Sequence, residues 1–219
     1  MKIELSENET LCVIVRHPKH SNNVISEEEA GRVRCQGCRL LKMGLKPEQI
    51  ASVIASVRLR SQSTAELLLE GLGISLPIVI SSAFDALDEI GSAVKDFKSA
   101  AVAQGMKPWE ALSEQHGAEL CKEFGIADRL VRATQFLSVC VTAAQLAGSG
   151  KVVVVSGHNG NGIEVSIELA KTQSLGERIS STDDLPNPVR YVVEAGIVLA
   201  FVNTETGLLS RDPVYLDAN

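Results

Sequence analysis

The stretch LCVIVRHPKHSNN, residues 11–23, joins a short apolar run to a cluster of polar and cationic side chains. The run LCVIV, residues 11–15, has the length and β-branched content of a strand that is buried on both faces of a parallel sheet. Arg16 and His17 follow it directly, side by side, at its carboxyl end. Ligands of open α/β sheets bind outside the carboxyl ends of the strands, so this pair marks a candidate site.

Strands and helices alternate along the chain. Ser26 and Glu29 have the spacing of an N-cap and its capping-box partner, and they predict the start of the first helix. The alternation predicts an α/β fold with a mostly parallel sheet that helices cover on both faces. The expected strands are residues 11–15, 51–56, 77–81, 151–156 and 191–202, and the clearest helices are about 26–41, 61–74 and 163–172.

Length and composition predict a single domain. The chain has 219 residues, of which 45% are hydrophobic, and this is enough to bury one substantial core. A long helical pattern after the third expected strand predicts a helical insertion at about residues 92–147. We therefore expect one domain over residues 1–219 that contains this insertion.

Charge and cysteine content restrict the partners and the compartment. The net charge of -6 argues against binding to nucleic acid or to an anionic membrane, so any anion site must be local. The amino terminus lacks the pattern of a signal peptide, and no apolar run approaches the roughly 20 residues of a membrane span. Five scattered cysteines suit reduced thiols better than a disulfide framework. We expect a cytoplasmic protein.

The expected strand ends bring cations and imidazoles to one edge of the sheet. Besides Arg16 and His17, Ser56 ends the second expected strand, Arg60 follows it, and His158 follows the strand at 151–156. Guanidinium groups bind phosphate oxygens in a bidentate manner, and an imidazole nitrogen can attack phosphorus. Together these side chains predict phosphoryl transfer without a metal, through a phosphohistidine, with a carboxyl group needed to protonate the leaving oxygen.

Four blocks of sequence resemble the histidine phosphatase superfamily. The family signature is Arg-His-Gly with an asparagine five residues beyond the glycine, and VIVRHPKHSNN at 13–23 resembles it. The segment ASVRLRSQSTAELLLEGLGI at 55–74 resembles the family block Ser-Pro-Leu-x-Arg-Ala-x-Gln-Thr-Ala. FDALDEIG at 84–91 resembles the Leu-x-Glu segment, and VVVVSGHNG at 152–160 is similar to the Gly-His-Asn block of small bacterial members that act on phosphohistidine proteins.

The resemblance implies a three-layer α/β/α fold and a role for each matching residue. His17 matches the nucleophile, and Glu89 matches the proton donor, which Asp85 or Asp88 could replace. The remaining matches are Arg16 and Arg60 as the phosphate clamp, His158 as the second histidine of the pocket, and Asn23 and Asn159 as substrate-binding residues.

Several positions depart from the family pattern. Pro18 stands where the family has glycine after the nucleophile, which removes a backbone N–H and restricts φ. Lys19 and His20 make the entrance more cationic, and Val57 stands where proline is common. These departures leave room for a divergent or weakly active member.

Other kinds of site fit the sequence less well. The segment GHNGNG, residues 157–162, has neither the Gly-x-Gly-x-x-Gly spacing of dinucleotide sites nor the Gly-Lys-Ser/Thr ending of a P-loop. Cys35 and Cys38 form a CxxC without a matching pair, which argues against zinc. The arginines oppose a metal ion among the histidines. We therefore expect no metal and no cofactor.

The sequence predicts a metal-independent histidine phosphatase that hydrolyses a phosphomonoester or a phosphohistidine through His17. Its expected partner is a phosphorylated small molecule or a phosphoprotein, and there is no signal for a particular oligomeric state. Three alternatives stay open: a non-catalytic phospholigand-binding module of the same fold, a phosphoglycerate mutase-type phosphotransferase, and a nucleotide-binding regulator that uses GHNGNG.

Overall fold

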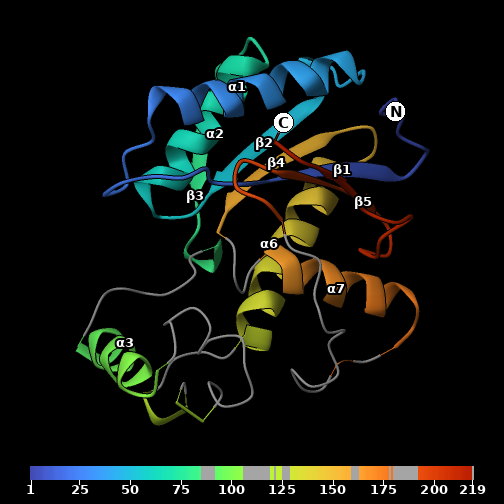
Figure 1. The fold of residues 1–219 in the computed structure, drawn as a ribbon. Helices are drawn as coiled ribbons and strands as arrows, with labels where there is room; N and C mark the ends of the chain where they lie inside the picture. Colours follow the sequence, from blue (N-terminus) through green and yellow to red (C-terminus); the bar gives the residue numbers. More distant parts are fainter. Residues whose placement is uncertain are drawn as a thin grey trace.

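The computed structural model describes residues 1–84, 92–105, 119–120, 122–124, 129–158, 163–177, 179 and 192–218 (Figure 1). The strands are β1 (Glu9–Arg16), β2 (Ile50–Ala55), β3 (Ile78–Ile80), β4 (Val152–Gly157), β5 (Ile197–Asn203) and β6 (Val214–Leu216). The helices are α1 (Glu27–Lys42), α2 (Leu59–Gly71), α3 (Ser92–Ala103), α6 (Arg129–Ala147) and α7 (Ile163–Ser174), with short 3-10 turns η1 (Pro47–Gln49) and η2 (Ser82–Phe84).

The strands form one mixed sheet in the order β3-β2-β4-β1-β5-β6. The neighbours from β3 to β1 pair in parallel, whereas β5 and β6 add antiparallel partners at the other side. The prediction of an α/β fold with a mostly parallel sheet is confirmed. The strand predicted from LCVIV is β1, which lies inside the sheet and is buried along its whole length.

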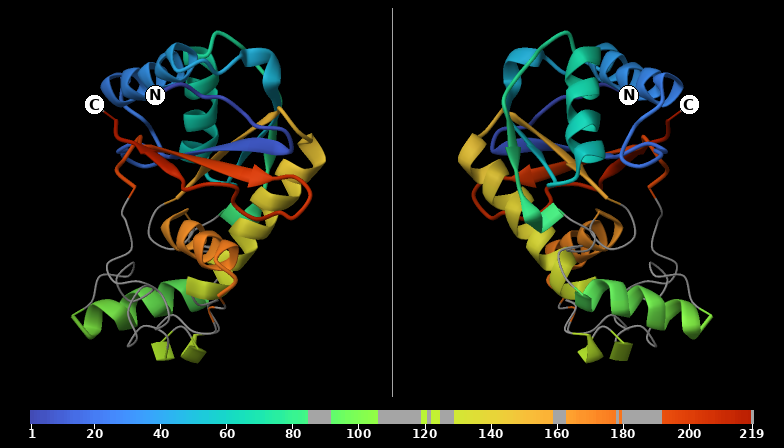
Figure 2. Two further views of the ribbon diagram at one scale, coloured as in Figure 1. Left: turned by 90° about the vertical axis from the view of Figure 1, so that its right-hand side faces the viewer. Right: turned by 90° about the vertical axis from the view of Figure 1, so that its left-hand side faces the viewer.

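Helices cover both faces of the sheet. Alternate residues of a strand face opposite sides, and Leu11 and Val13 pack in the cluster that includes residues of α1 and α2, whereas Cys12 and Ile14 pack in the cluster that includes α6 and α7. Figures 1 and 2 show these helix pairs on opposite sides of the sheet, with α3 farther away. Each fully buried aliphatic side chain contributes about 1.5–3 kcal/mol to this packing.

Helix α1 begins where the sequence predicts. The Ser26 hydroxyl accepts a hydrogen bond from the Glu29 N–H at 3.3 Å, which satisfies one of the donors at the helix start. The Glu29 carboxylate instead pairs with Arg32 at 2.9 Å. The cap is therefore present, while the carboxylate half of the capping box is replaced by an ion pair.

Helix α6 has a composition that resembles that of a membrane span. The window Leu130–Ala147 is long enough to cross a membrane and has a mean hydropathy of 1.3. Ala133, Phe136, Cys140 and Ala144 form a buried stripe at helical spacing, and the last three belong to the core cluster on the sheet. This packing is typical of a helix that covers a sheet.

Strand β5 starts later than the sequence pattern predicts. The expected strand covered 191–202, whereas β5 begins at Ile197 and the described residues before it form a turn. Ala195 adopts a left-handed φ of 58°, and the Gly196 N–H donates to the Val193 carbonyl at 2.8 Å. The apolar pattern of residues 191–202 does not reveal this turn, because hydrophobicity alone does not distinguish a strand from a buried loop.

Two glycines allow α1 and α2 to cross closely. A Cβ on Gly37 would lie 2.5 Å from the Leu68 carbonyl oxygen and 2.7 Å from the Gly71 carbonyl carbon. We expect Gly37→Ala to lower the free energy of unfolding by about 1–3 kcal/mol, because backbone atoms must move apart. Urea denaturation measures this loss.

A matched control lies on the same helix. A Cβ on Gly31 would meet no atom within 4 Å outside its own helix, so Gly31→Ala should raise the free energy of unfolding by about 0.5–1 kcal/mol through helix propensity. Equal stability of the two variants would mean that α1 and α2 do not approach at Gly37.

Candidate active site

Three neighbouring parallel strands end at the same edge of the sheet. The register pairs Arg16 of β1 with Gly157 of β4, and Ala55 of β2 with Ser156 of β4. His17, Ser56 and His158 each follow one of these strands directly. Because β4 lies between β1 and β2, His158 occupies the middle of the edge. The sequence prediction that these strand ends meet is confirmed.

Three imidazole rings form a cluster at this edge, and we call His17, His20 and His158 the histidine cluster. The ring centroids of His17 and His158 are 4.9 Å apart, and those of His17 and His20 are 5.1 Å apart. His158 is buried, His17 is partly buried and His20 is exposed. The cluster therefore leads from the surface to the buried end of β4.

The hydrogen bond of His17 selects its tautomer. Its Nδ1 lies 2.8 Å from the Pro18 carbonyl oxygen, which can only accept. Nδ1 must therefore carry a proton, and the neutral ring keeps a lone pair on Nε2. Pro18 lacks a backbone N–H but supplies this carbonyl as another residue would, so a proline at this position still orients the His17 ring.

Arg16 is a buried side chain that the loop before β5 holds in place. Its Nη1 donates to the Val192 carbonyl at 2.6 Å, and its Nη2 lies 3.8 Å from Glu194 Oε1. The Arg16 N–H donates to the Gly196 carbonyl at 3.0 Å. The left-handed Ala195 lies within this loop. Val192 and Glu194 are not among the predicted site residues, because the sequence pattern predicts a strand for their segment.

Arg60 reaches the histidine cluster from the first turn of α2. Its Nη1 donates to Asn23 Oδ1 at 2.7 Å. Asn22 and Asn23 have positive φ values of 50° and 67°, and Ser21 and Val24 exchange backbone hydrogen bonds around them. This is the geometry of a tight turn for which asparagine is well suited. Asn23 therefore forms a turn and also contacts the predicted phosphate clamp.

The electrostatics of the cluster favour the neutral form of its imidazoles. Burial lowers the pKa of His17 to about 4, and the charges of Arg60, His20 and Arg16 act in the same direction against the hydrogen bond to Pro18. Burial also holds the pKa of His158 well below its usual value, helped by neighbouring cationic groups. Neutral rings beside fixed guanidinium charges form a site that favours an anion.

His20 is the most exposed member of the cluster. Burial and the charge of Arg60 lower its pKa, whereas the carboxylate of Glu194 raises it. Glu194 thus interacts with both Arg16 and His20 at the rim of the site. Glu194 is an acidic residue at the site that the sequence pattern does not predict.

Two of the predicted site residues cannot be compared with this geometry. Glu89 and Asn159 lie outside the described residues, as do Asp85 and Asp88. Their roles remain predictions. The described part of the site contains His17, His158, Arg16, Arg60 and Asn23 in one neighbourhood.

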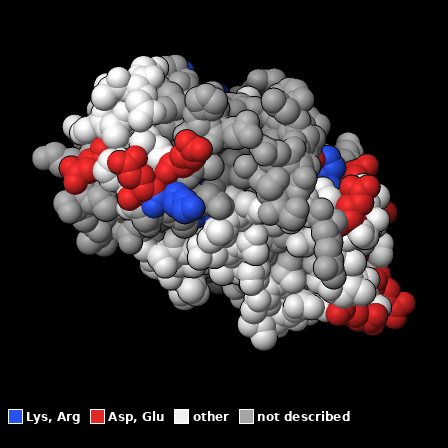
Figure 3. Space-filling model, turned by 90° about the horizontal axis from the view of Figure 1, so that it is seen from below, with Lys and Arg blue, Asp and Glu red and all other residues white. Residues whose placement is uncertain are grey.

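The surface charge is consistent with a local anion site. Figure 3 views the molecule from below, where acidic side chains gather at two ends and only a few basic side chains accompany them. The described residues on this face form no continuous basic surface. The net charge of the chain is -6, so the cations at the strand ends are a local concentration.

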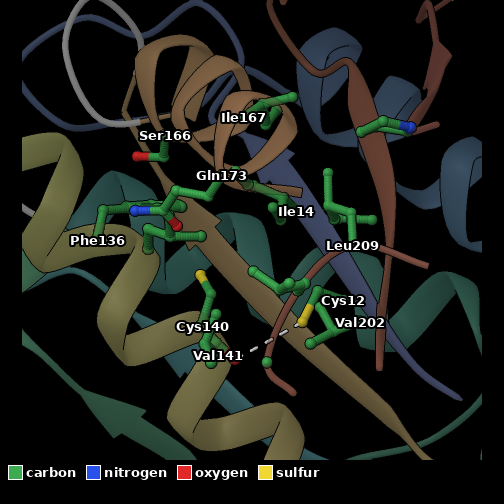
Figure 4. Close-up of a pocket in the computed structure, with 16 residues that line it drawn as sticks. Cys12, Ile14, Phe136, Cys140, Val141, Ser166, Ile167, Gln173, Val202 and Leu209 are labelled. Atoms are coloured by element: carbon green, nitrogen blue, oxygen red, sulfur yellow. Dashed lines mark hydrogen bonds between the residues drawn. The ribbon is translucent and has the colours of Figure 1, made fainter. Parts of the chain in front are cut away.

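An apolar cavity of about 30 Å³ lies apart from the histidine cluster, between α6, α7 and the sheet (Figure 4). Its lining includes Cys12 and Cys140 but none of the predicted site residues. Burial raises the pKa of Cys12 to about 12 and that of Cys140 well above its usual value. This space holds about one or two water molecules at most, and its thiols are packing residues, as expected.

Comparisons with known proteins identify the fold. No family model and no curated protein sequence matches the chain. The phosphoglycerate mutase from Bacillus anthracis str. Sterne matches with a TM-score of 0.60 and 16% identity, over 95% of this chain and 93% of that one. A mycobacterial glucosyl-3-phosphoglycerate phosphatase in complex with inorganic phosphate matches with a TM-score of 0.53 and 16% identity, over 95% and 98% of the two chains.

A third structure has the same architecture. A protein assigned as the phosphohistidine phosphatase SixA from Nakamurella multipartitia matches with a TM-score of 0.52 and 11% identity, over 97% of both chains. These matches extend over nearly the full length of each protein, and they agree with the fold that the sequence blocks imply. The chain has the same α/β fold as these phosphoglycerate mutase and phosphatase structures.

Proposed function

We propose that the protein is a metal-independent phosphatase that hydrolyses a phosphomonoester or a phosphohistidine through a covalent intermediate on His17. One observation carries this proposal. The Pro18 carbonyl fixes the proton of His17 on Nδ1, which leaves the Nε2 lone pair beside a second imidazole and the two arginines. This combination supplies a nucleophile and a cationic binding site for a phosphoryl group.

In the first step His17 Nε2 attacks phosphorus. The N–P bond forms as the bond between phosphorus and the leaving oxygen breaks, and the leaving oxygen takes a proton from a general acid. Arg16 and Arg60 stabilise the negative charge on the phosphoryl oxygens. Glu89 is our candidate for the acid, on the basis of its place in the sequence blocks.

In the second step water attacks the phosphohistidine. The new P–O bond replaces the P–N bond, inorganic phosphate leaves, and the lone pair returns to His17 Nε2. The same carboxyl group, now deprotonated, accepts a proton from the attacking water. No metal takes part in either step of this scheme.

A non-catalytic phospholigand-binding module is the competing proposal, and Pro18 is the observation in its favour. Proline removes a backbone N–H next to the nucleophile, and this N–H could otherwise donate to a phosphoryl oxygen. A module of this kind would bind phosphate tightly and turn nothing over. A phosphotransferase of the mutase type would instead return the phosphoryl group to its product.

Hydrolysis of an aryl phosphate in the presence of a chelator separates these functions. We expect stoichiometric release of the aryl alcohol and inorganic phosphate at a rate that the chelator does not change. Tight phosphate binding without release of the alcohol would support the binding module. Transfer of the phosphoryl group to an added phosphoglycerate, with little free phosphate, would support the mutase.

The compartment and the partner belong to the same proposal. The four described cysteines, Cys12, Cys35, Cys38 and Cys140, are free thiols, which is typical of proteins in a reducing compartment. We therefore place the protein in the cytoplasm, with a phosphorylated small molecule or a phosphoprotein as its substrate.

The pKa of His17 leads to a prediction about pH. A pKa of about 4 means that the nucleophilic form is complete at pH 7 and is lost as the pH falls through 4, instead of through the usual value of 6.5. The measurement is an NMR titration of the imidazole Cε1–H signals of the phosphate-free protein, assigned with His17→Gln. A midpoint at pH 6 or above would show that the ring is not buried among cations as described.

A further inference from the structure

Ser56 makes a buried contact with His158 that the scheme above does not use. Its side chain is inaccessible to solvent, and its Oγ lies 2.7 Å from His158 Nε2. Three more hydrogen bonds hold this serine: its N–H is shared between Ser61 Oγ at 3.2 Å and the Ser156 carbonyl at 3.3 Å, and its Oγ accepts the Arg58 N–H at 3.1 Å. The position of the hydroxyl oxygen is therefore well defined.

Counting hydrogens assigns the direction of the contact. The Ser56 hydroxyl has one hydrogen, and among the described residues His158 Nε2 is the acceptor within bonding distance. If Nε2 carried a proton, it would donate to the Ser56 oxygen and could not accept from the hydroxyl. The hydroxyl hydrogen would then be buried without an acceptor among the described residues, which is unfavourable. The hydroxyl therefore donates, Nε2 accepts, and the proton of the neutral ring is on Nδ1.

The Nδ1–H of His158 then has no acceptor among the residues that the structure describes. His158 is 3% exposed, and its Nδ1 is a buried nitrogen without a hydrogen-bond partner among the described residues. Its ring lies 4.9 Å from that of His17, the proposed nucleophile. A buried, unsatisfied donor at this place is suited to an anionic oxygen that arrives with the substrate.

We propose that Ser56 is a positioning residue: it fixes His158 as the Nδ1–H tautomer, so that this buried N–H donates to a phosphoryl oxygen bound at His17. The phosphoryl part of the proposal rests on the proposed function. The assignment of the tautomer is independent of the proposed function, because it follows from the hydrogen bonds of the phosphate-free protein. Without the Ser56 hydroxyl, the His158 ring would populate both the Nδ1–H and the Nε2–H tautomers. In the molecules with the Nε2–H tautomer, Nδ1 could not donate to the phosphoryl oxygen.

The tautomer is measured directly by NMR. The ¹⁵N signals of the His158 ring in phosphate-free protein should show a protonated Nδ1 and an unprotonated Nε2, assigned by comparison with His158→Gln. The opposite pattern would overturn the proposal. This measurement needs no turnover, so it stands or fails separately from the phosphatase function.

Substitutions test the consequence for catalysis. Ser56→Ala should shift His158 toward the Nε2–H tautomer and lower kcat for an aryl phosphate by about 10- to 100-fold, since partners that orient a functional imidazole have effects of this size. Ser56→Thr keeps the hydroxyl and should restore the Nδ1–H signal. Ser156→Ala is the matched control, because it removes a buried hydroxyl whose described partner is Ser61.

Each outcome of the variants is decisive. A change of tautomer and kcat in Ser56→Ala, with both preserved in Ser156→Ala, supports the positioning role. An unchanged tautomer in Ser56→Ala overturns it, and equal losses of kcat in both alanine variants reduce it to a structural contribution. If Ser56→Ala does not fold, the ¹⁵N pattern of the wild-type protein still decides the tautomer.

Discussion

His17→Ala is expected to abolish turnover of a phosphomonoester, with kcat lower by on the order of 10³-fold or more. The substitution removes the Nε2 lone pair that forms the covalent intermediate. No other described imidazole is both oriented by a backbone carbonyl and placed beside His158. Phosphate binding should persist, because the arginines remain. Steady-state hydrolysis of an aryl phosphate measures the loss, and isothermal titration with inorganic phosphate measures the binding.

His20→Ala is the informative comparison for this variant. His20 has the same chemistry, and its ring centroid lies only 5.1 Å from that of His17, but its side chain is exposed. We expect its loss to reduce kcat by less than about tenfold, as for a rim residue that does not touch the reacting atoms. An active His17→Ala protein together with an inactive His20→Ala protein would mean that His20, and not His17, is the nucleophile.

Arg60→Ala is expected to lower kcat/KM by about 10²- to 10³-fold, or roughly 3–4 kcal/mol of transition-state stabilisation. The charge of Arg60 lowers the pKa of all three imidazoles of the histidine cluster, so Arg60 lies close to the site where we place the phosphoryl group. Most of the effect should appear as weaker binding of substrate and phosphate. Initial rates over a range of aryl phosphate concentrations separate KM from kcat.

Two arginine variants complete this experiment. Arg60→Lys keeps the charge but loses the fork that binds two oxygens and Asn23, so its kcat/KM should lie between those of the wild type and Arg60→Ala. Arg34→Ala removes a surface arginine that pairs with Glu27 and Glu70, and it should leave kcat/KM unchanged. A normal kcat/KM in Arg60→Ala would remove Arg60 from the phosphate clamp.

The edge of the sheet could be predicted from local sequence. A β-branched run such as 11–15 has few alternatives to a buried strand, and parallel strands place their carboxyl ends together. Arg16, His17 and His158 follow directly from this rule, because each stands next to the end of its strand. Ser26 likewise predicts the start of α1 through chemistry that involves only its neighbours in the chain.

Contacts that depend on distant segments could not be predicted in this way. Val192 and Glu194 reach Arg16 because the chain turns before β5, and a hydrophobic pattern carries no signal for that turn. The donor–acceptor direction between Ser56 and His158 requires the bond distances of both side chains. The antiparallel β5 and β6 also depend on how the chain returns to the sheet, which is a property of the whole fold.

A crystal structure of the protein with bound vanadate tests the central claim most directly. Vanadate imitates the phosphoryl group during transfer, so it should bond to His17 Nε2, with its oxygens accepting hydrogen bonds from Arg16, Arg60 and the Nδ1–H of His158. Vanadate bound elsewhere, or seated at the strand ends without a bond to His17, would contradict the proposal that this edge of the sheet transfers a phosphoryl group through His17.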